Sequence, residues 1–244
     1  MSLAVRDEIR QRIGPRWTTR LRCLVRGKEW PRWGNLRRVR PFSDTFGFDR
    51  GTPVDRYYLH RFLEAHRDLI RGDVLEIQTT GFAERYGRDL DRMDSVDIAP
   101  EFRPTFLCDL AHSGDVLPSS SYDCFLLPNT FQHLREPEAA LGHALRVLKP
   151  GGVILASSAG LLPLTGDVPD YQRLSEAGWS ELAGRVWKGC DVQVESYGNC
   201  LVAVAAMLGL TLEELTREEL DARDPRYPVL IVVRCRKPAP GVRA

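Results

Sequence analysis

The sequence predicts an α/β protein with an open, doubly wound sheet of about seven strands, mostly parallel, in which the last strand is antiparallel. Short, continuous apolar runs alternate with helical patterns from about residue 54 onward, as is typical of a parallel sheet covered on both faces. A strongly β-branched run close to the C-terminus supplies a closing strand. The length of 244 residues is enough for one such domain and an appendage.

Each expected strand is a short run of apolar or β-branched residues between turn signals. The strands are DVLEIQ (73–78), DSVDI (94–98), TFLC (105–108), YDCFLLP (122–128), GGVILASS (151–158), DVQVESYG (191–198) and YPVLIVVRC (227–235). Helices are expected over VDRYYLHRFLEAHRDL (54–69), in PEAALGHALRVLKPGG (137–152), and in NCLVAVAAMLGL and TLEELTREEL (199–220). In the second of these, Pro150-Gly151-Gly152 should end the helix and start the next strand.

The N-terminal region is basic. Residues 1–50 hold thirteen Lys or Arg against five Asp or Glu, interleaved with Trp17, Trp30 and Trp33. We expect residues 1–50 to form a helical cap and loop, with the helix over about 1–28, residues 51–238 to form the main domain, and 239–244 to be a flexible tail. One interpretation of the cap is an arm that binds nucleic acid or phosphate. The favoured one is an amphipathic cap with solvated arginines and tryptophans that pack on the main domain.

Composition excludes several classes of protein. No apolar run is long enough to span a bilayer, and the start lacks the apolar core of a secretory signal, so we expect a cytoplasmic protein with no membrane partner. The six cysteines include no Cys-x-x-Cys pair, which argues against a zinc site and a disulfide framework. Histidines are widely spaced, and we expect no metal.

Polar side chains follow successive strands of the predicted sheet, where ligands of doubly wound proteins bind. Glu76 is near the end of the first strand, and Asp97 and Ile98 end the second, about twenty residues after the first turn, the offset at which a carboxylate accepts ribose hydroxyls. After the third strand, Asp109 is placed to accept an adenine amine while the backbone of Leu110 contacts the ring. The fourth strand leads into Asn129 and Thr130, which should border the reactive end of the ligand.

These residues resemble those of the class I S-adenosylmethionine-dependent methyltransferases. The match covers about residues 54–160 well, with "VLEI", "SVDI" and "CDL", and the tail through 235 more loosely. Its most specific part is YDCFLLPNTFQHLREPEAALGHALRVLKPGGVIL, which is typical of the small-molecule branch. The resemblance implies a Rossmann-like fold, S-adenosylmethionine as cofactor and S-adenosylhomocysteine as product.

A second segment, FGFDRGTPVDRYYLHRFL, resembles bacterial relatives in glycan and natural-product pathways. In these relatives a Tyr-bearing helix covers the cofactor. The resemblance therefore implies that Arg56, Tyr57 and Tyr58 close over its methionine end. An aromatic packing face on a capping helix is an equally supported alternative.

The turn after the first strand departs from the family, because Gln78, Thr80 and Phe82 stand where three glycines are usual. Glycine lets the backbone approach a ligand closely, and a dinucleotide pyrophosphate demands this strictly, so a nicotinamide enzyme is disfavoured. S-adenosylmethionine presents only a carboxylate and an ammonium here. We expect the hydroxyls of Thr79 and Thr80, with N–H groups of the following helix start, to bind that carboxylate, and Gly81 to take any left-handed turn. A fold that has lost its ligand is the alternative.

His133, just after the fourth strand, is the best candidate for a base, which an alcohol acceptor needs and a neutral amine does not. The alternative is that His133 only orients the loop. The insertion after the fifth strand carries Asp167, Asp170 and Tyr171, and it forms the acceptor wall in relatives. These tend to carry a Trp where this chain has Gln172, which leaves their substrate in doubt. Ser175, farther along the insertion, is expected to cap a helix rather than to act as a nucleophile.

The resulting function hypothesis is methyl transfer to a hydroxyl or amine of a small molecule, such as a sugar or a natural-product intermediate. One alternative is a non-catalytic or repurposed protein that binds S-adenosylmethionine or S-adenosylhomocysteine. Another is an RNA methyltransferase with the basic start as its arm, disfavoured because the fourth strand lacks the Asn/Asp-Pro-Pro-aromatic turn of base-amine methylators. The expected partner is a small-molecule acceptor, a nucleic acid is not expected, and a homodimer stays open.

Overall fold

The structure is a computed structural model that describes residues 17, 19–166, 168–239 and 241. The chain divides into two units, residues 1–40 and 41–244. Most of the helical cap predicted over residues 1–28 lies outside the described residues, although residues 19–25 are helical. Of the predicted tail, residues 240 and 242–244 also lie outside them.

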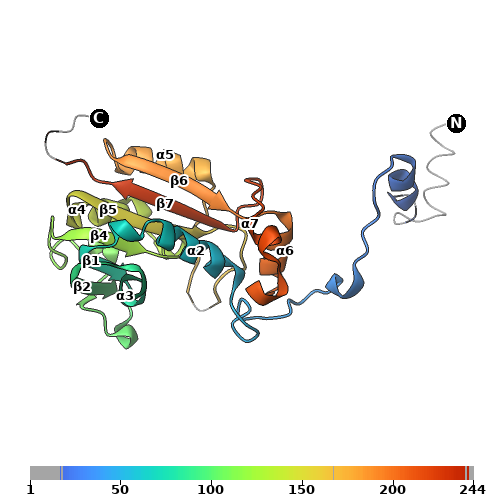
Figure 1. The fold of residues 1–244 in the computed structure, drawn as a ribbon, viewed down its shortest axis with the longest axis horizontal. Coiled ribbons are helices and arrows are strands. Elements are labelled where there is room, and N and C mark those ends of the chain that lie inside the picture. Colours follow the sequence, from blue (N-terminus) through green and yellow to red (C-terminus); the bar gives the residue numbers. More distant parts are fainter. Residues whose placement is uncertain (1–16, 18, 167, 240, 242–244) are drawn as a thin grey trace. The chain divides into compact units, whose positions relative to one another are not determined.

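One sheet of seven strands organises the larger unit, in the order β3-β2-β1-β4-β5-β7-β6 (Figure 1). The strand β7 is antiparallel to both of its neighbours, and the other six strands run in one direction. This arrangement confirms the predicted Rossmann-like sheet. The strands are β1 (Gly72–Ile77), β2 (Leu90–Asp97), β3 (Phe106–Leu107), β4 (Tyr122–Leu127), β5 (Leu148–Ala159), β6 (Asp191–Tyr197) and β7 (Leu230–Arg236).

Helices cover both faces of the sheet. The α-helices are α2 (Val54–Ala65), α3 (Gly81–Tyr86), α4 (Pro137–Val147), α5 (Glu176–Val186), α6 (Cys200–Met207) and α7 (Arg217–Asp221). Short 3₁₀ turns are η1 (Gly34–Leu36), η2 (Arg67–Leu69), η3 (Pro100–Phe102), η4 (Leu110–His112), η5 (Phe131–His133) and η6 (Leu212–Glu214).

Two buried clusters form the core, one on each face. Alternate strand residues point to opposite faces, so that Leu75 of β1 joins the cluster beneath α4 and α5, whereas Val74 joins the cluster beneath α2, α3, α6 and α7. The first cluster contains Trp179 and Trp187, whose indole N–H groups donate to Ser158 Oγ and to the carbonyl of Leu141. Helices thus cover both faces of the sheet, and a ligand can reach it only at the ends of the strands.

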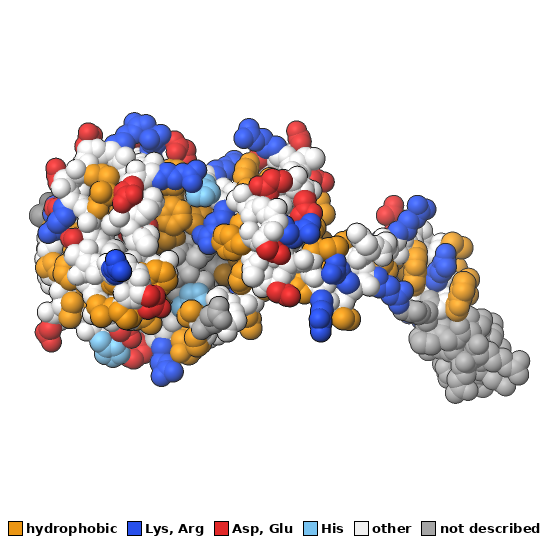
Figure 2. Space-filling model, turned by 90° about the horizontal axis from the view of Figure 1, so that it is seen from below, with side chains coloured by type: hydrophobic (Ala, Val, Ile, Leu, Met, Phe, Trp, Pro, Cys, Tyr) orange, Lys and Arg blue, Asp and Glu red, His pale blue; other side chains and the backbone are white. Residues whose placement is uncertain are grey.

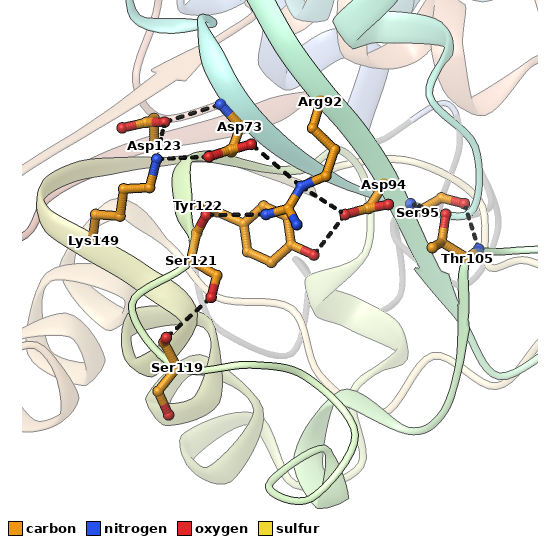
Figure 3. Close-up of polar contacts among 10 residues, drawn as sticks. All are labelled: Asp73, Arg92, Asp94, Ser95, Thr105, Ser119, Ser121, Tyr122, Asp123 and Lys149. Carbon is orange, nitrogen blue, oxygen red and sulfur yellow. Dashed lines mark hydrogen bonds and ion pairs between the residues drawn. The ribbon is translucent and has the colours of Figure 1, made fainter.

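The amino ends of the strands are held together by an ionic network (Figure 3). Lys149 Nζ lies 2.7 Å from Asp73 Oδ2 and 2.6 Å from Asp123 Oδ2. Gly72 approaches the same group: its φ is +65°, and a Cβ there would lie 2.5 Å from Asp123 Oδ2. Arg92 continues the network through Asp73 and Asp94, at 3.3 and 3.2 Å, and Tyr122 donates to Asp94. Ion pairs therefore occupy the amino ends of these strands, which leaves the carboxyl ends as the place for a ligand.

Within the described residues, no helix is both long and apolar enough to cross a membrane.

Candidate functional site

The turns that follow β3, β2, β1 and β4 lie in that order along the carboxyl edge of the sheet. The strand order changes direction between β1 and β4, which is where doubly wound proteins bind ligands. Most of the sequence-predicted site residues lie in these turns.

In the turn after β1, the left-handed residue is Gln78, with φ 72°, and its side chain is exposed. The prediction that Gly81 would take this conformation was wrong, because Gly81 is the first residue of α3. Glycine enters the left-handed region freely, whereas other residues do so at a cost of about 1–2 kcal/mol. Gln78 therefore keeps a backbone shape that glycine favours.

Glu76 supports this turn from below. Its side chain is buried, and its two carboxylate oxygens accept the N–H groups of Phe82, at 3.1 Å, and Ala83, at 2.8 Å. Burial raises the pKa of Glu76 to about 7, against the lowering effect of those two hydrogen bonds. Glu76 thus fixes the start of α3, and its direct contact with a cofactor stays a prediction.

The start of α3 offers little to an anion. Its N–H groups are already used: Phe82 and Ala83 donate to Glu76, and Gly81 donates to Thr79 Oγ1 at 3.4 Å. These partners make the Thr79 and Thr80 hydroxyls the more available donors, and the binding of a cofactor carboxylate by these N–H groups stays a prediction. Thr80 donates its hydroxyl proton to Glu84 at 2.7 Å, which leaves the Thr79 hydroxyl as the better donor in the turn.

The ring of Phe82 does not occupy the turn region. It is half-buried between α2 and α3, with its centroid 6.0 Å from that of His60 and 6.5 Å from that of Tyr86. The Gln78 side chain is exposed, and the Phe82 ring packs against His60 and Tyr86. Neither of these bulky residues, which replace glycines, therefore fills the space beyond the end of β1. The residues present therefore fit a cofactor that lies beyond β1.

The end of β2 presents a carboxylate and an apolar side chain together. Asp97 Oδ1 accepts the N–H of Ala99 at 2.7 Å, and Oδ2 has no hydrogen-bond partner among the described residues. Ile98 is 69% exposed, unusual for an isoleucine. A half-buried acceptor beside an exposed apolar surface suits a nucleoside, whose ribose is polar and whose base has an apolar face.

The segment after β3 carries the next acidic residue. Asp109 caps η4 by accepting the Ala111 N–H at 2.9 Å, and its Oδ2 lies 3.5 Å from His112 Nδ1. The Leu110 side chain is buried in the core, so only its backbone is placed for the predicted contact with a base.

At the end of β4, Asn129 is the centre of a network rather than a free ligand. Its Nδ2 donates to Asp55 Oδ2 of α2 at 3.0 Å, its Oδ1 accepts from Ser157 Oγ of β5, and its backbone N–H donates to the same Ser157 oxygen. Asn129 also has a positive φ of 47°. Sequence reasoning missed Asp55 and Ser157, although an acid in the first turn of the predicted helix over residues 54–69 was a usable signal for Asp55.

The loop after Asn129 holds His133. A carbonyl can only accept, so His133 Nδ1 carries the proton that is donated to Pro169 O at 3.0 Å, and Nε2 accepts from the Gln132 amide at 3.2 Å. Both nitrogens are engaged, which favours the loop-orienting role over that of a free base. Thr130 donates its hydroxyl to Pro128 O.

The insertion after β5 packs beside this loop. Tyr171 donates its N–H to Gln132 O at 2.7 Å, and Gln172 Nε2 donates to the carbonyls of Phe131 and Leu134. The guanidinium of Arg173 donates to three carbonyl groups of the insertion and lies 3.2 Å from the Asp170 carboxylate. Asp167 lies outside the described residues. A cavity of about 620 Å³ lies farther out, between the start of α4 and α5.

The two tyrosines of α2, Tyr57 and Tyr58, contact α7 and the core. Tyr58 is buried, stacks on Tyr197 at 5.5 Å, and donates to Leu220 O, so the structure assigns it to the core rather than to a cofactor lid. Tyr57 donates to Asp221 of α7 at 2.8 Å. The packing-face alternative therefore describes Tyr58. Arg56 lies 3.9 Å from Asp55, near the network of Asn129.

Residues 79–156 match the family model described as a methyltransferase domain. The match begins in the turn after β1 and runs into β5, so it includes the turns that follow β2, β3 and β4. The chain therefore contains a methyltransferase domain, and it has the fold of class I S-adenosylmethionine-dependent enzymes. This domain supports S-adenosylmethionine as the cofactor, with S-adenosylhomocysteine as the product formed from it.

Solved structures share the fold of this chain. An S-adenosylmethionine-dependent methyltransferase from Archaeoglobus fulgidus is 14% identical over 75% of this chain and 94% of its own, with a TM-score of 0.51. The N-methyltransferase NodS from Bradyrhizobium japonicum, solved with S-adenosylhomocysteine, is 12% identical over 80% and 94%, with a TM-score of 0.51. The [4+2]-cyclase SpnF is 16% identical over 91% and 93%, with a TM-score of 0.50. No curated protein matches the chain.

Proposed function

We propose that this methyltransferase transfers the methyl group of S-adenosylmethionine to a hydroxyl or amine of a small molecule, such as a sugar or a natural-product intermediate. One observation carries the proposal: Asp97, Ile98 and Asp109 present acceptors and an apolar surface at successive strand ends, while the bulky residues of the β1 turn leave that edge open. The resemblance of the NTFQHLREP block to small-molecule enzymes supports the substrate class.

S-adenosylmethionine supplies a methyl group on a sulfonium, which an aligned nucleophile displaces in line. The chain has to hold and align the reactants and exclude water. Asp97 would accept the ribose hydroxyls, Asp109 the adenine amine, and the Thr79 hydroxyl would donate to the carboxylate. The loop that holds His133 and Tyr171 would form the wall beside the acceptor.

The state of His133 separates the two kinds of acceptor. An amine that arrives neutral needs no strong base and fits this arrangement as it stands. For a hydroxyl acceptor, His133 Nε2 has to lose its hydrogen bond from the Gln132 amide and accept the proton of the hydroxyl group instead. The variant His133→Asn should therefore lower kcat for a hydroxyl acceptor by about 100-fold or more, as loss of general-base catalysis does, and change it little for an amine.

The experiment that tests the proposal is calorimetry of S-adenosylhomocysteine binding by the full chain, followed by turnover of S-adenosylmethionine with a panel of sugar and aminosugar acceptors. Binding with turnover of one acceptor class supports the proposal. Binding without turnover of any acceptor would favour the alternative of a repurposed protein. Two observations support that alternative: the Asn129 side chain is fully paired within the chain, and SpnF, which shares the fold, is named as a cyclase. Absence of binding would reject both.

A further inference from the structure

The segment 17–40, here termed the basic arm, belongs to the N-terminal unit. It contains eight Lys or Arg residues against one acidic residue, Glu29. None of its described residues belongs to either core cluster of the sheet.

The helical part of the arm has an apolar stripe. Trp17, Leu21, Leu24 and Val25 have the spacing of one helix face, and they are 59%, 50%, 77% and 84% exposed. The side of the helix away from this stripe carries basic residues, among them Arg22. The helix is therefore amphipathic, and the side chains of its apolar face are exposed.

The remainder of the arm also combines apolar and basic residues, but it forms no long helix. Its large apolar side chains are also exposed, and basic residues stand between them. They are Trp30, Trp33, Leu36 and Val39. Figure 2 shows apolar side chains in orange interleaved with Lys and Arg in blue over this N-terminal segment, with little red. The guanidinium of Arg20 lies 5.5 and 5.9 Å from the ring centroids of Trp17 and Trp30.

We propose that the basic arm binds the surface of an anionic phospholipid membrane. Trp side chains favour the headgroup level, Leu and Val favour the acyl boundary, and each Lys or Arg close to an anionic surface is attracted to it. An amphipathic basic helix with Trp and Leu on one face is the form that lies in the plane of the interface. The expectation of no membrane partner rested on spanning segments, and a helix in the interface does not need to span.

Two other anionic or apolar occupants fit less well. A nucleic acid would use the arginines and could stack on the tryptophans, but it leaves the exposed aliphatic stripe of Leu21, Leu24 and Val25 without a role. A second copy of the chain would cover that stripe, but it would bring two strongly basic arms together, and like charges repel. The aliphatic stripe and the positive charge are used together only at a lipid surface.

The test is binding of the full chain to vesicles of phosphatidylcholine alone and of phosphatidylcholine with phosphatidylglycerol, read by cosedimentation and by tryptophan fluorescence. Three of the five tryptophans are in the arm, and the other two, Trp179 and Trp187, are buried in the core. We expect binding to the anionic vesicles only, a blue shift of the emission, and quenching by brominated lipid.

Two paired variants separate the apolar and the charged contributions. Leu21→Ser with Leu24→Ser keeps every charge and should weaken vesicle binding by roughly tenfold or more. Arg22→Gln with Arg26→Gln keeps the stripe and should weaken it by a similar factor. The matched control, Arg22→Lys with Arg26→Lys, keeps the charge and should bind vesicles as the native chain does. Binding of S-adenosylhomocysteine should be unchanged in all three, which shows that the fold is intact.

Several outcomes would overturn the proposal. The first is salt-sensitive binding of single-stranded RNA by a chain that does not bind anionic vesicles, since it assigns the arm to nucleic acid. The second is vesicle binding that the Leu→Ser pair does not weaken, since the stripe would then have no role. The third is an emission already blue-shifted without lipid and unaffected by it, since the tryptophans would then be packed on the chain's own domain.

Discussion

Asp97 is the side chain on which cofactor binding should depend most, because it combines a half-buried position with an oxygen that has no partner among the described residues. We expect Asp97→Ala to weaken S-adenosylhomocysteine binding by about 10- to 100-fold, the effect of losing a hydrogen bond to a charged group. Asp91→Ala, at the exposed start of the same strand, is the matched control and should bind normally. Calorimetry measures both, and equal affinities would remove Asp97 from the site.

Glu76 should make folding stability depend on pH. Its pKa is raised by burial from an ordinary value of 4.5 to about 7, so the folded state favours the protonated carboxyl. This contribution is fully present below about pH 4.5 and is lost as the pH rises through about 7, with a total of about 3 kcal/mol.

The measurement is the free energy of unfolding of the native chain and of Glu76→Gln, by urea denaturation from about pH 4.5 to about 8, the range that spans this titration. The variant cannot titrate at this position, so the native chain should lose stability relative to it as the pH rises. Parallel curves would show that Glu76 has an ordinary pKa in the folded protein.

For single residues, the sequence predicted the place of a side chain in the fold better than its hydrogen-bond partners. Asp97 and Asp109 lie where their strands end, because the order of apolar runs determines where strands end. The roles of Gln78 and Asn129 could not be predicted, because a positive φ on a residue other than glycine and a hydrogen bond from Asn129 to Asp55, 74 positions away, depend on tertiary structure. The Ser175 helix cap was predicted and confirmed, since such a cap is local.

Among the elements, α2 is joined to the turn after β4 by a hydrogen bond between buried Asp55 and half-buried Asn129. Asp55 accepts from Asn129 there, and its loss leaves the Asn129 amide without that partner. We expect Asp55→Ala to lower the free energy of unfolding by about 1–3 kcal/mol. Asp68→Ala, in an exposed ion pair of 3.6 Å, should change it by less than about 1 kcal/mol.

Thermal or urea denaturation of the two variants decides this point. A second reading is the affinity for S-adenosylhomocysteine, which should fall in Asp55→Ala because the turn after β4 loses its support. Unchanged stability and unchanged affinity together would mean that α2 does not position this turn.

Element boundaries show where sequence patterns stop being informative. The helix predicted to run to Pro150 ends as α4 at Val147, because Leu148 is already extended and pairs with Tyr122 of β4. The segment TLEELTREEL divides into η6 and α7, because Thr211 and Thr216 each begin a capping box. Periodicity predicted that helix would occur there, and the caps determined that it came in two pieces.

For the whole molecule, the larger unit contains both core clusters, whose residues lie between Val54 and Cys235. We therefore expect residues 41–244 alone to fold cooperatively and to bind S-adenosylhomocysteine with the affinity of the full chain. Circular dichroism melting and calorimetry check this. A truncated chain that is unfolded, or that binds much more weakly, would assign the first 40 residues a part in the fold or in the site.

The sheet itself was the most predictable feature of the molecule. Strands buried on both faces give continuous apolar runs, and the order of such runs with helices between them restricts the topology strongly. The placement of the N-terminal unit could not be derived in the same way, because a segment with mixed Trp and Arg composition is compatible with several environments. The domain boundaries predicted at residues 50 and 238 stay predictions.

The left-handed conformation of Gln78 has a consequence for how enzymes of this kind are found. Gln78 has the positive φ that glycine favours, although the glycines usual in this turn are absent, so a search that requires those glycines would discard this chain. Gln78→Gly should leave the loop trajectory unchanged. Genomes can therefore hide further members whose cofactor turns are recognisable by shape alone.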